Sequence, residues 1–237
     1  MVTITVYVPC DTTARSLGAD KVAQRIERAA AARSQELRVV RNGSRGLFWL
    51  EPLVEIDTPD GRVAYGPVTP EAVESLVEAG LFEGRQDHAL ALGLTEEIEY
   101  LKRQQRLTFS RIGITDPLSI DDYTALRGFN GLKAALSRDG QSIVDEVKTS
   151  GLRGRGGAAF PTGIKWQTVL NEPEGQKYIV CNADEGDSGT FADRLVMECD
   201  PYMLIEGMTI AGLAVGADRG YIYLRSEYPL AKAILDE

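Results

Sequence analysis

The segment from Gly151 to Gly163 constrains the fold and function of this chain more than any other. It reads Gly-Leu-Arg-Gly-Arg-Gly-Gly-Ala-Ala-Phe-Pro-Thr-Gly and holds five glycines in thirteen residues. Because glycine has no Cβ, the backbone amides of such a loop can approach an anion closely. Arg153, Arg155 and Lys165 add positive charge at the same place. The loop is a candidate cradle for a phosphate or a dinucleotide, with a mobile surface loop as the alternative.

This loop matches only part of two nucleotide-binding motifs. Residues 154–159 fit the alanine-ended dinucleotide fingerprint, but that fingerprint follows a strand, whereas Ser142–Thr149 is helical in pattern. Gly163 is followed by Ile164 and Lys165, and not by the Lys-Ser or Lys-Thr of a P-loop. The motif match alone is therefore weak.

An apolar strand, predicted at Tyr178–Cys181, runs straight into Asn182, Asp184, Glu185 and Asp187. Ligands of open α/β sheets bind at the carboxyl ends of strands. These polar groups are suited to accept hydrogen bonds from the hydroxyls and ring nitrogens of a sugar-bearing cofactor. Two alternatives stay open: a Mg²⁺ or Ca²⁺ site, although EF-hand spacing is missing, or a solvated turn.

The elements after this strand predict a parallel sheet. An apolar helix is expected at Tyr202–Val215, with Asp200 as its N-cap and Pro201 at its first position. A strand follows at Tyr221–Leu224, and the order β-loop-α-β is typical of parallel neighbours. A βαβαβ domain begun at Gly151 is unfinished at residue 237. The fold class is therefore expected to be α/β, with the first part of a Rossmann-like domain here.

Composition excludes several classes of function. The 35 acidic and 26 basic side chains give a net charge of -9, so a polyanion is repelled and nucleic acid is not an expected partner. The most apolar stretch, Met203–Ala217, contains Glu206 and is shorter than a bilayer span. We expect a buried core helix there and no membrane span. No secretory signal precedes the first strand, so the chain is expected in the cytoplasm.

The first ninety residues are expected to form one small α/β domain. The Pro59-Asp60-Gly61 turn joins the two strands of a hairpin. Strands are predicted at Val2–Val8, Leu37–Arg41, Leu47–Thr58 and Arg62–Tyr65, with helices at Asp20–Ser34 and after Thr69 as N-cap. The order β, α, β, β, β, α and the phrase Tyr65–Val73 resemble the thioredoxin-like ferredoxin fold.

The cysteines are too few for a cluster. The chain has only Cys10, Cys181 and Cys199, without CxxC spacing. In the ferredoxin family, two cysteines follow the first strand and two more precede the hairpin, near Gly43–Phe48 here. The second pair is missing, and one thiolate cannot hold a two-iron cluster. We predict a degenerate domain without cluster ligands, kept for docking; an unrelated α/β domain is the alternative, and no metal site is expected.

The chain divides into an N-terminal domain at residues 1–88, a charged solvated linker at 89–120, and a nucleotide domain at 121–237. Helices are predicted at Asp121–Arg127, Gly131–Ser137 and Ser142–Thr149. His88 lies in a polar turn with no second histidine, so it is expected to be an ordinary surface residue.

The pair of segments Gly151–Trp166 and Asn182–Gly186 resembles the flavin-binding, NADH-oxidising subunit of respiratory complex I and its relatives in NAD-reducing hydrogenases and NAD-dependent formate dehydrogenases. The resemblance covers about residues 110–237. Fusion to a cysteine-poor thioredoxin-like domain makes the whole chain look most like the beta, or diaphorase, subunit of soluble molybdenum-dependent formate dehydrogenases.

The resemblance implies an FMN between the glycine loop and the acidic strand end, with NAD(H) stacked on its ring. Hydride transfer then belongs to the flavin, no catalytic side chain is needed, and Glu185 tunes the flavin potential. The family pattern departs here at Asp187, usually glutamate, and at Ala159, usually glycine. The cofactor-binding residues it implies are Gly154, Arg155, Gly156, Gly157, Ala158, Phe160, Lys165, Asn182, Asp184, Glu185 and Asp187.

The family also implies partners. These are a catalytic subunit with molybdenum and iron-sulfur clusters, a small thioredoxin-like 2Fe-2S subunit, and NAD(H). A 4Fe-4S cluster is typical of the family, but its ligands are absent from these 237 residues. The alternatives are the flavin subunit of complex I or of a hydrogenase, and a non-catalytic docking module. The isolated chain is expected to bind flavin weakly or not at all.

Overall fold

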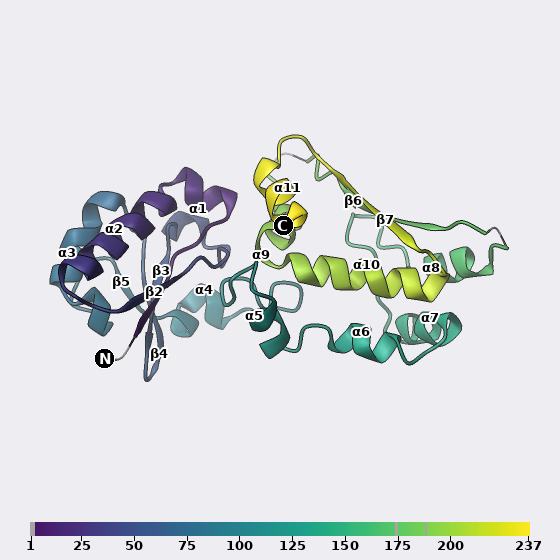
Figure 1. Cartoon of the computed structure of the whole chain (residues 1–237), viewed down its shortest axis with the longest axis horizontal. Helices are drawn as coiled ribbons and strands as arrows, with labels where there is room; N and C mark the ends of the chain where they lie inside the picture. The colour runs from purple at the N-terminus through teal and green to yellow at the C-terminus, as the bar shows by residue number, and fades with distance from the viewer. Residues whose placement is uncertain (1–2, 174, 188) are drawn as a thin grey trace.

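The computed structural model describes residues 3–173, 175–187 and 189–237; Val2, where the first predicted strand begins, lies outside them. Two α/β halves are joined by a connector, residues 103–119, which contains no helix or strand (Figure 1). The N-terminal half contains β1 (Ile4–Tyr7), α1 (Thr12–Ser16), α2 (Ala19–Ala32), β2 (Leu37–Val40), β3 (Val54–Thr58), β4 (Gly61–Tyr65), α3 (Val73–Glu78) and β5 (Ala91–Leu94). The rest contains α4 (Glu99–Lys102), α5 (Ile120–Ala125), α6 (Asn130–Ala135), α7 (Gly140–Thr149), α8 (Thr162–Asn171), β6 (Tyr178–Ala183), α9 (Ala192–Cys199), α10 (Pro201–Val215), β7 (Arg219–Leu224) and α11 (Pro229–Asp236). The predicted α/β class is confirmed.

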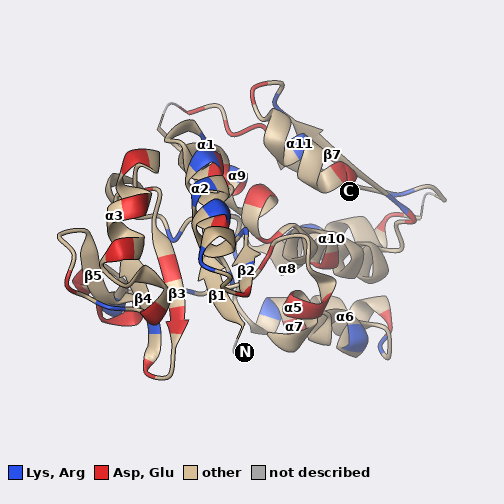
Figure 2. Ribbon diagram, turned by 60° about the vertical axis from the view of Figure 1, so that its left-hand side comes forward, with Lys and Arg blue, Asp and Glu red and all other residues tan. Residues whose placement is uncertain are grey.

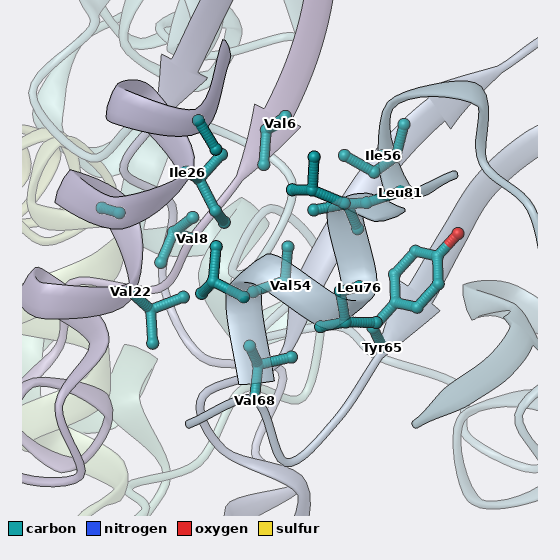
Figure 3. Close-up of a cluster of buried hydrophobic side chains, with 14 of the residues drawn as sticks. Val6, Val8, Val22, Ile26, Val54, Ile56, Tyr65, Val68, Leu76 and Leu81 are labelled. Carbon is teal, nitrogen blue, oxygen red and sulfur yellow. The ribbon is translucent and has the colours of Figure 1, made fainter. Parts of the chain in front are cut away.

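The N-terminal sheet has the strand order β2-β1-β3-β4-β5. β1 is parallel to β2, and the other neighbours are antiparallel. Val6 of β1 lies opposite Ile56 of β3. Both pack with Val22 and Ile26 of α2 and with Leu76 of α3 in a buried cluster (Figure 3). The apolar spacing predicted for the first long helix therefore forms the core of this half.

Two local predictions for the N-terminal half differ from the structure, one in the start of a strand and one in a capping hydrogen bond. The predicted strand Leu47–Thr58 is interrupted, because Phe48–Leu50 forms a 3-10 turn and β3 begins only after it. Pro52 has no backbone N–H to donate to a sheet, which explains the late start of the strand. Thr69 does lie at the N-cap of the 3-10 turn Pro70–Ala72 that leads into α3, with proline in the first turn as predicted, but its side chain makes no capping hydrogen bond.

The segment predicted to be a solvated linker contains structure. β5 pairs antiparallel with β4 and becomes an edge of the sheet. Further on, Ile112 is 1% exposed, and the Arg62 guanidinium donates to the backbone oxygens of Gly113 and Ile114, at 3.0 Å each. β5 and the Gly113–Ile114 backbone thus contact the N-terminal half, whereas Ile112 packs with Leu195 and Cys199 of α9. The domain boundaries at 88 and 120 stay predictions.

The C-terminal half is built on two parallel strands, β6 and β7, as predicted. Ile179 of β6 packs into a core with Ala214 and Val215 of α10, so α10 covers one face of this pair. The alternate residues of the two strands point the other way and are exposed: Tyr178, Val180, Tyr221 and Tyr223.

The helix predicted to be buried core is only half buried. In α10, Ile205 is 42% and Leu213 is 39% exposed, because only one face meets the strands and helices around it. Asp200 also does not cap this helix through its side chain. Its Oδ2 instead accepts a hydrogen bond from Arg111 Nε at 2.9 Å, from a residue in the connector. Among the described residues, no helix combines the length and the apolar character that a bilayer crossing requires.

Glu206 ties α10 to the helices before it. Its carboxylate accepts hydrogen bonds from the Tyr123 hydroxyl, from the Phe129 amide at 2.8 Å and from the Leu132 amide at 2.9 Å. Burial alone would raise the pKa of Glu206, but these hydrogen bonds lower it below its ordinary value. A charge inside the most apolar segment is therefore a fixed link between helices.

Candidate functional site

A cavity of ≈ 930 Å³ lies where the glycine loop, the carboxyl end of β6 and the connector meet. One wall is the connector at residues 104–109. The second is Arg155, Gly156 and Gly157, and the third is formed by the acidic segment at residues 182–187 together with the start of α9. Small-molecule and cofactor sites occupy roughly 300–1,000 Å³. The space therefore suits a nucleotide-sized ligand.

The glycine loop is closed at its base like a hairpin. The Gly154 N–H donates to the Phe160 oxygen at 2.9 Å, and the Thr162 N–H donates to the Leu152 oxygen at 2.9 Å. Residues 155–159 form the tip, where Gly157 has φ 96° and Ala159 has φ 50°. Both values lie in the left-handed region, which costs an alanine energy that a glycine does not pay. A glycine at position 159 would adopt this conformation without that cost.

Glu185 has a structural partner that its sequence context did not reveal. The residue is 7% exposed. Its Oε1 accepts from the Asp193 N–H at 3.0 Å and its Oε2 accepts from the Arg194 N–H at 3.1 Å, which caps the first turn of α9. The Tyr228 hydroxyl adds a contact at 3.3 Å. A carboxylate is stabilised by the amides at a helix N-terminus, so Glu185 both borders the cavity and fixes the direction of α9.

The other acidic residues of the segment are more open. Asn182 Oδ1 accepts from the Asp184 N–H at 3.1 Å and shapes the turn after β6. The Asp184 carboxylate lies 3.6 Å from Arg225 Nε and is 54% exposed. Arg225 also donates to the Glu185 backbone oxygen at 2.7 Å, so one arginine of the segment after β7 contacts two successive residues of the acidic segment.

The structure brings together most of the residues predicted to bind the cofactor. Those that line the cavity are Arg155, Gly156, Gly157, Asn182, Asp184, Glu185 and Asp187. Gly154, Ala158, Phe160 and Lys165 are not among the residues that line it. Phe160 lies at the base of the loop and is 51% exposed, and Lys165 is on the exposed first turns of α8. The binding roles of all these residues stay predictions.

Two charged residues that line the cavity were missed in the sequence. Arg106 lies in the segment predicted to be a solvated linker, and nothing in its local pattern points to a ligand. Burial, and then the nearby Arg45 guanidinium, lower the pKa of Arg106 below its ordinary value. Asp193 is the second missed residue; burial, and then the Glu185 carboxylate, raise its pKa. Both residues reach the cavity only because of the tertiary fold, and neither belongs to a recognisable sequence motif.

The charge of the cavity is mixed. Asp184, Glu185, Asp187 and Asp193 face it from one side, while Arg106 and Arg155 supply cationic groups from the other two walls. Acidic and basic positions are likewise interspersed along the whole ribbon (Figure 2). No cysteine or histidine is among the described residues that line this cavity. The arrangement can bind and orient a ligand that carries both hydroxyls and a phosphate.

No metal-binding arrangement is found within residues 3–173, 175–187 and 189–237: no group of three or more His, Cys, Asp or Glu side chains is suitably placed. The three cysteines are free thiols. Cys10 donates to the Arg41 oxygen at 3.3 Å, and burial raises the pKa of its thiol to about 12. A thiol held protonated in this way is a poor metal ligand.

Comparison with known proteins relates this site to a flavin domain. Residues 147–237 match the family model described as the Nuo51 FMN-binding domain. Over 130 residues the chain is 56% identical to the NADP-reducing hydrogenase subunit HndC of Solidesulfovibrio fructosivorans, covering 55% of this chain and 26% of that protein. It is 50% identical over 117 residues to an NADH-quinone oxidoreductase subunit of Aquifex aeolicus, covering 49% and 27%. The chain thus spans about a quarter of the length of these relatives.

Solved structures give weaker likenesses. An NAD+-reducing [NiFe]-hydrogenase aligns with a TM-score of 0.46 at 23% identity, covering 98% of this chain and 39% of that one. The thioredoxin-like [2Fe-2S] ferredoxin from Aquifex aeolicus aligns with a TM-score of 0.34 at 23% identity, covering 39% of this chain and 99% of that one. These scores are below 0.5, so the thioredoxin-like character of the N-terminal half stays a resemblance.

Proposed function

We propose that this chain supplies part of the FMN and NAD(H) site of an oxidoreductase that moves electrons between iron-sulfur clusters and NAD+. One observation carries the proposal. The glycine loop and the acidic strand end, which are separated in sequence, line the same cavity, within the segment that matches an FMN-binding domain.

The residues of the cavity fit a flavin mononucleotide. Gly156 and Gly157 carry no Cβ that would keep a phosphate from their amides, and Arg155 adds a guanidinium beside them. Asn182 and Asp184 offer amide and carboxylate oxygens to hydroxyls and ring N–H groups. When bound, FMN supplies the chemistry, since it exchanges a hydride with NAD(H) and passes electrons singly.

The protein's own residues then bind, orient and tune. Glu185 holds a fixed negative charge at the cavity because the amides of α9 and the Tyr228 hydroxyl stabilise its position. A fixed carboxylate disfavours additional negative charge on a nearby ligand. Asp187 lines the same cavity, and its side chain is one methylene shorter than the glutamate usual in the family.

For the electron donor we propose formate, delivered through a molybdenum- and iron-sulfur-containing subunit and a small thioredoxin-like 2Fe-2S subunit. The support is the cysteine-poor N-terminal domain joined to the flavin segment. A hydrogenase is the second candidate, since a relative sharing 56% identity is named as an NADP-reducing hydrogenase subunit. A docking module without catalysis is the third.

The test begins with the visible spectrum of the protein, purified with any sequence that its gene encodes beyond residue 237. Flavin bands that NADH bleaches are expected. Gly156→Val should weaken FMN binding, because the added side chain enters the cavity wall. Gly175→Val is the matched control, since a Cβ at either glycine meets nothing within 4 Å. A purified protein that neither retains nor takes up flavin would favour the docking module.

The donor is tested separately in the purified complex. Formate-dependent reduction of NAD+ would support the proposal. Reduction that requires hydrogen, with formate inactive, would replace formate dehydrogenase by hydrogenase and leave the flavin site unaffected.

A further inference from the structure

The helix α9 contacts both the cavity and the N-terminal half of the chain. Ala192, Asp193 and Val196 line the cavity described above. Glu198 and Cys199, at the end of the helix, are both 0% exposed. The N-terminal half covers both residues, and no local sequence pattern in either half predicts this contact. One short helix therefore separates the cavity from the N-terminal domain.

The contact at the end of α9 is polar and specific. Glu198 Oε2 accepts from the Thr12 N–H at 2.8 Å, and Glu198 Oε1 accepts from the Thr12 hydroxyl at 2.6 Å. One turn earlier, Arg194 Nη2 donates to the Thr13 hydroxyl at 2.8 Å. We call this set of contacts the seam. Two adjacent threonines thus hold two successive turns of α9.

Close packing surrounds the seam. A Cβ placed on Gly43 would lie 2.4 Å from Cys199 Cβ, so the backbone of the N-terminal half touches α9 there. The rings of Phe48 and Phe191 meet edge to face at 4.6 Å between centroids. Packed interiors do not deform continuously, so a shift of the N-terminal domain must be taken up by the helix or by the contacts.

Charge makes the seam sensitive to its geometry. Burial raises the pKa of both Glu198 and Asp11, despite the hydrogen bonds that each accepts. The Arg194 Nε lies 4.0 Å from Glu198 Oε1, and the charge of this guanidinium acts against the rise in both pKa values. A buried carboxylate that loses a partner retains its desolvation cost, so the Thr12 contacts are expensive to remove.

The other end of α9 carries the acidic segment. Glu185 accepts from the Asp193 and Arg194 amides, so its position follows the first turn of the helix. A rigid helix thus connects Thr12 at one end with Glu185 at the other. Coupling between sites is carried by such packed elements.

We propose that the N-terminal domain positions the cofactor cavity through α9, with Thr12 and Glu198 as the positioning residues. The domain then acts on the site without carrying electrons. This inference rests on the proposed function, because the ligand whose affinity it predicts is FMN.

The test compares Thr12→Val with Thr12→Ser in the protein purified with any sequence that its gene encodes beyond residue 237. Valine has nearly the shape of threonine but no hydroxyl, whereas serine keeps the hydroxyl. Two measurements are made on each protein: hydrogen exchange of the amides at 183–187 and 192–196, and the Kd for FMN from flavin fluorescence. Thr12→Val should increase exchange in both segments and weaken FMN binding about fivefold, at the lower end of usual coupling. Thr12→Ser should resemble the wild type.

Controls separate positioning from loss of fold. Thr149→Val removes a hydroxyl that bonds only within α7, and should change neither measurement. Protection of the β1 and β3 amides reports whether the N-terminal sheet is intact. If Thr12→Val loses that protection, Glu198→Gln is used as the test variant in its place, because glutamine keeps the shape of the glutamate side chain and one of its two acceptor oxygens.

Three results would overturn the inference. Exchange in the acidic segment and FMN affinity both equal to wild type in Thr12→Val would show that the seam does not position the site. A defect of the same size in Thr12→Ser, which keeps the hydroxyl, would show that loss of the hydroxyl is not the cause. Weaker FMN binding without any change in hydrogen exchange would show that the effect is not transmitted through α9. A wild-type protein that is purified with any sequence its gene encodes beyond residue 237 and still binds no FMN would instead count against the proposed function, and the exchange data would still decide on the seam.

Discussion

Glu51 is a buried carboxylate whose ionisation should determine how the stability of the N-terminal domain depends on pH. The residue is 4% exposed. Its carboxylate accepts hydrogen bonds from the Ser44 hydroxyl and, at 2.9 Å, from the Leu53 N–H. Burial, and then the nearby Asp11 carboxyl, raise the pKa of Glu51 from 4.5 to about 8.

The sign follows from which state holds the proton more tightly. Because the pKa of Glu51 is higher in the folded than in the unfolded state, folding favours the protonated form. This stabilisation is fully present below the unfolded pKa of 4.5 and decreases as the pH rises toward about 8, where it is lost. One pKa unit corresponds to about 1.4 kcal/mol. The whole window from 4.5 to about 8 is therefore worth about 5 kcal/mol in the free energy of unfolding.

Glu51→Gln keeps the shape of the side chain and removes its ionisation. The stability of the variant relative to wild type should rise by about 1.4 kcal/mol for each pH unit within this window. Urea unfolding at several pH values measures this, with Trp49 fluorescence as the probe in a Trp166→Phe background. The exposed Glu78→Gln change is the control and should show no such slope. A difference between Glu51→Gln and wild type that is the same at every pH would refute the reasoning.

Three further predictions concern the cavity and the glycine loop beside it. Glu185→Gln should raise the flavin midpoint potential, because a negative charge is lost, and an unchanged potential in a redox titration would contradict this argument. The same change should lower the free energy of unfolding by about 1 kcal/mol, because it weakens the cap of α9. Ala159→Gly should stabilise the chain in urea unfolding by roughly 0.5 kcal/mol, since the relief at φ 50° exceeds the added chain entropy, whereas the control Ala158→Gly should destabilise it by a similar amount. Arg106→Gln should weaken FMN or NADH binding about tenfold, or roughly 1.4 kcal/mol, and equal affinities by titration would remove Arg106 from the site.

Local patterns predicted the parts of the fold that depend on neighbouring residues. The one-sided spacing of Val22 and Ile26 predicted α2, and the Pro59-Asp60-Gly61 turn predicted the β3–β4 hairpin, because each feature acts within a few residues. The same holds for the site. The glycine loop and the acidic strand end were found as motifs, and the order of β6, α10 and β7 placed the acids at the carboxyl end of a parallel strand.

Other features required the tertiary structure. β5 was not predicted, because an edge strand of four residues is defined by its partner β4 and not by its own pattern. Asp200 has the local pattern of an N-cap, yet its carboxylate pairs with Arg111, which is distant in sequence. A long-range charged contact here replaced the local hydrogen bond, and no local rule weighs the two against each other.

Local patterns were enough to predict the class of this protein: two α/β segments, a glycine-rich loop with basic neighbours and an acidic strand end. Three features became visible only in the folded chain: the Glu185 carboxylate caps α9, Arg106 reaches the cavity, and Thr12 binds Glu198 across 186 positions of sequence. Sequence motifs predict the local backbone conformation and hydrogen bonds of a single segment. Contacts between distant segments are selected by the burial of charge and apolar surface in the complete fold, which periodicity and spacing do not encode.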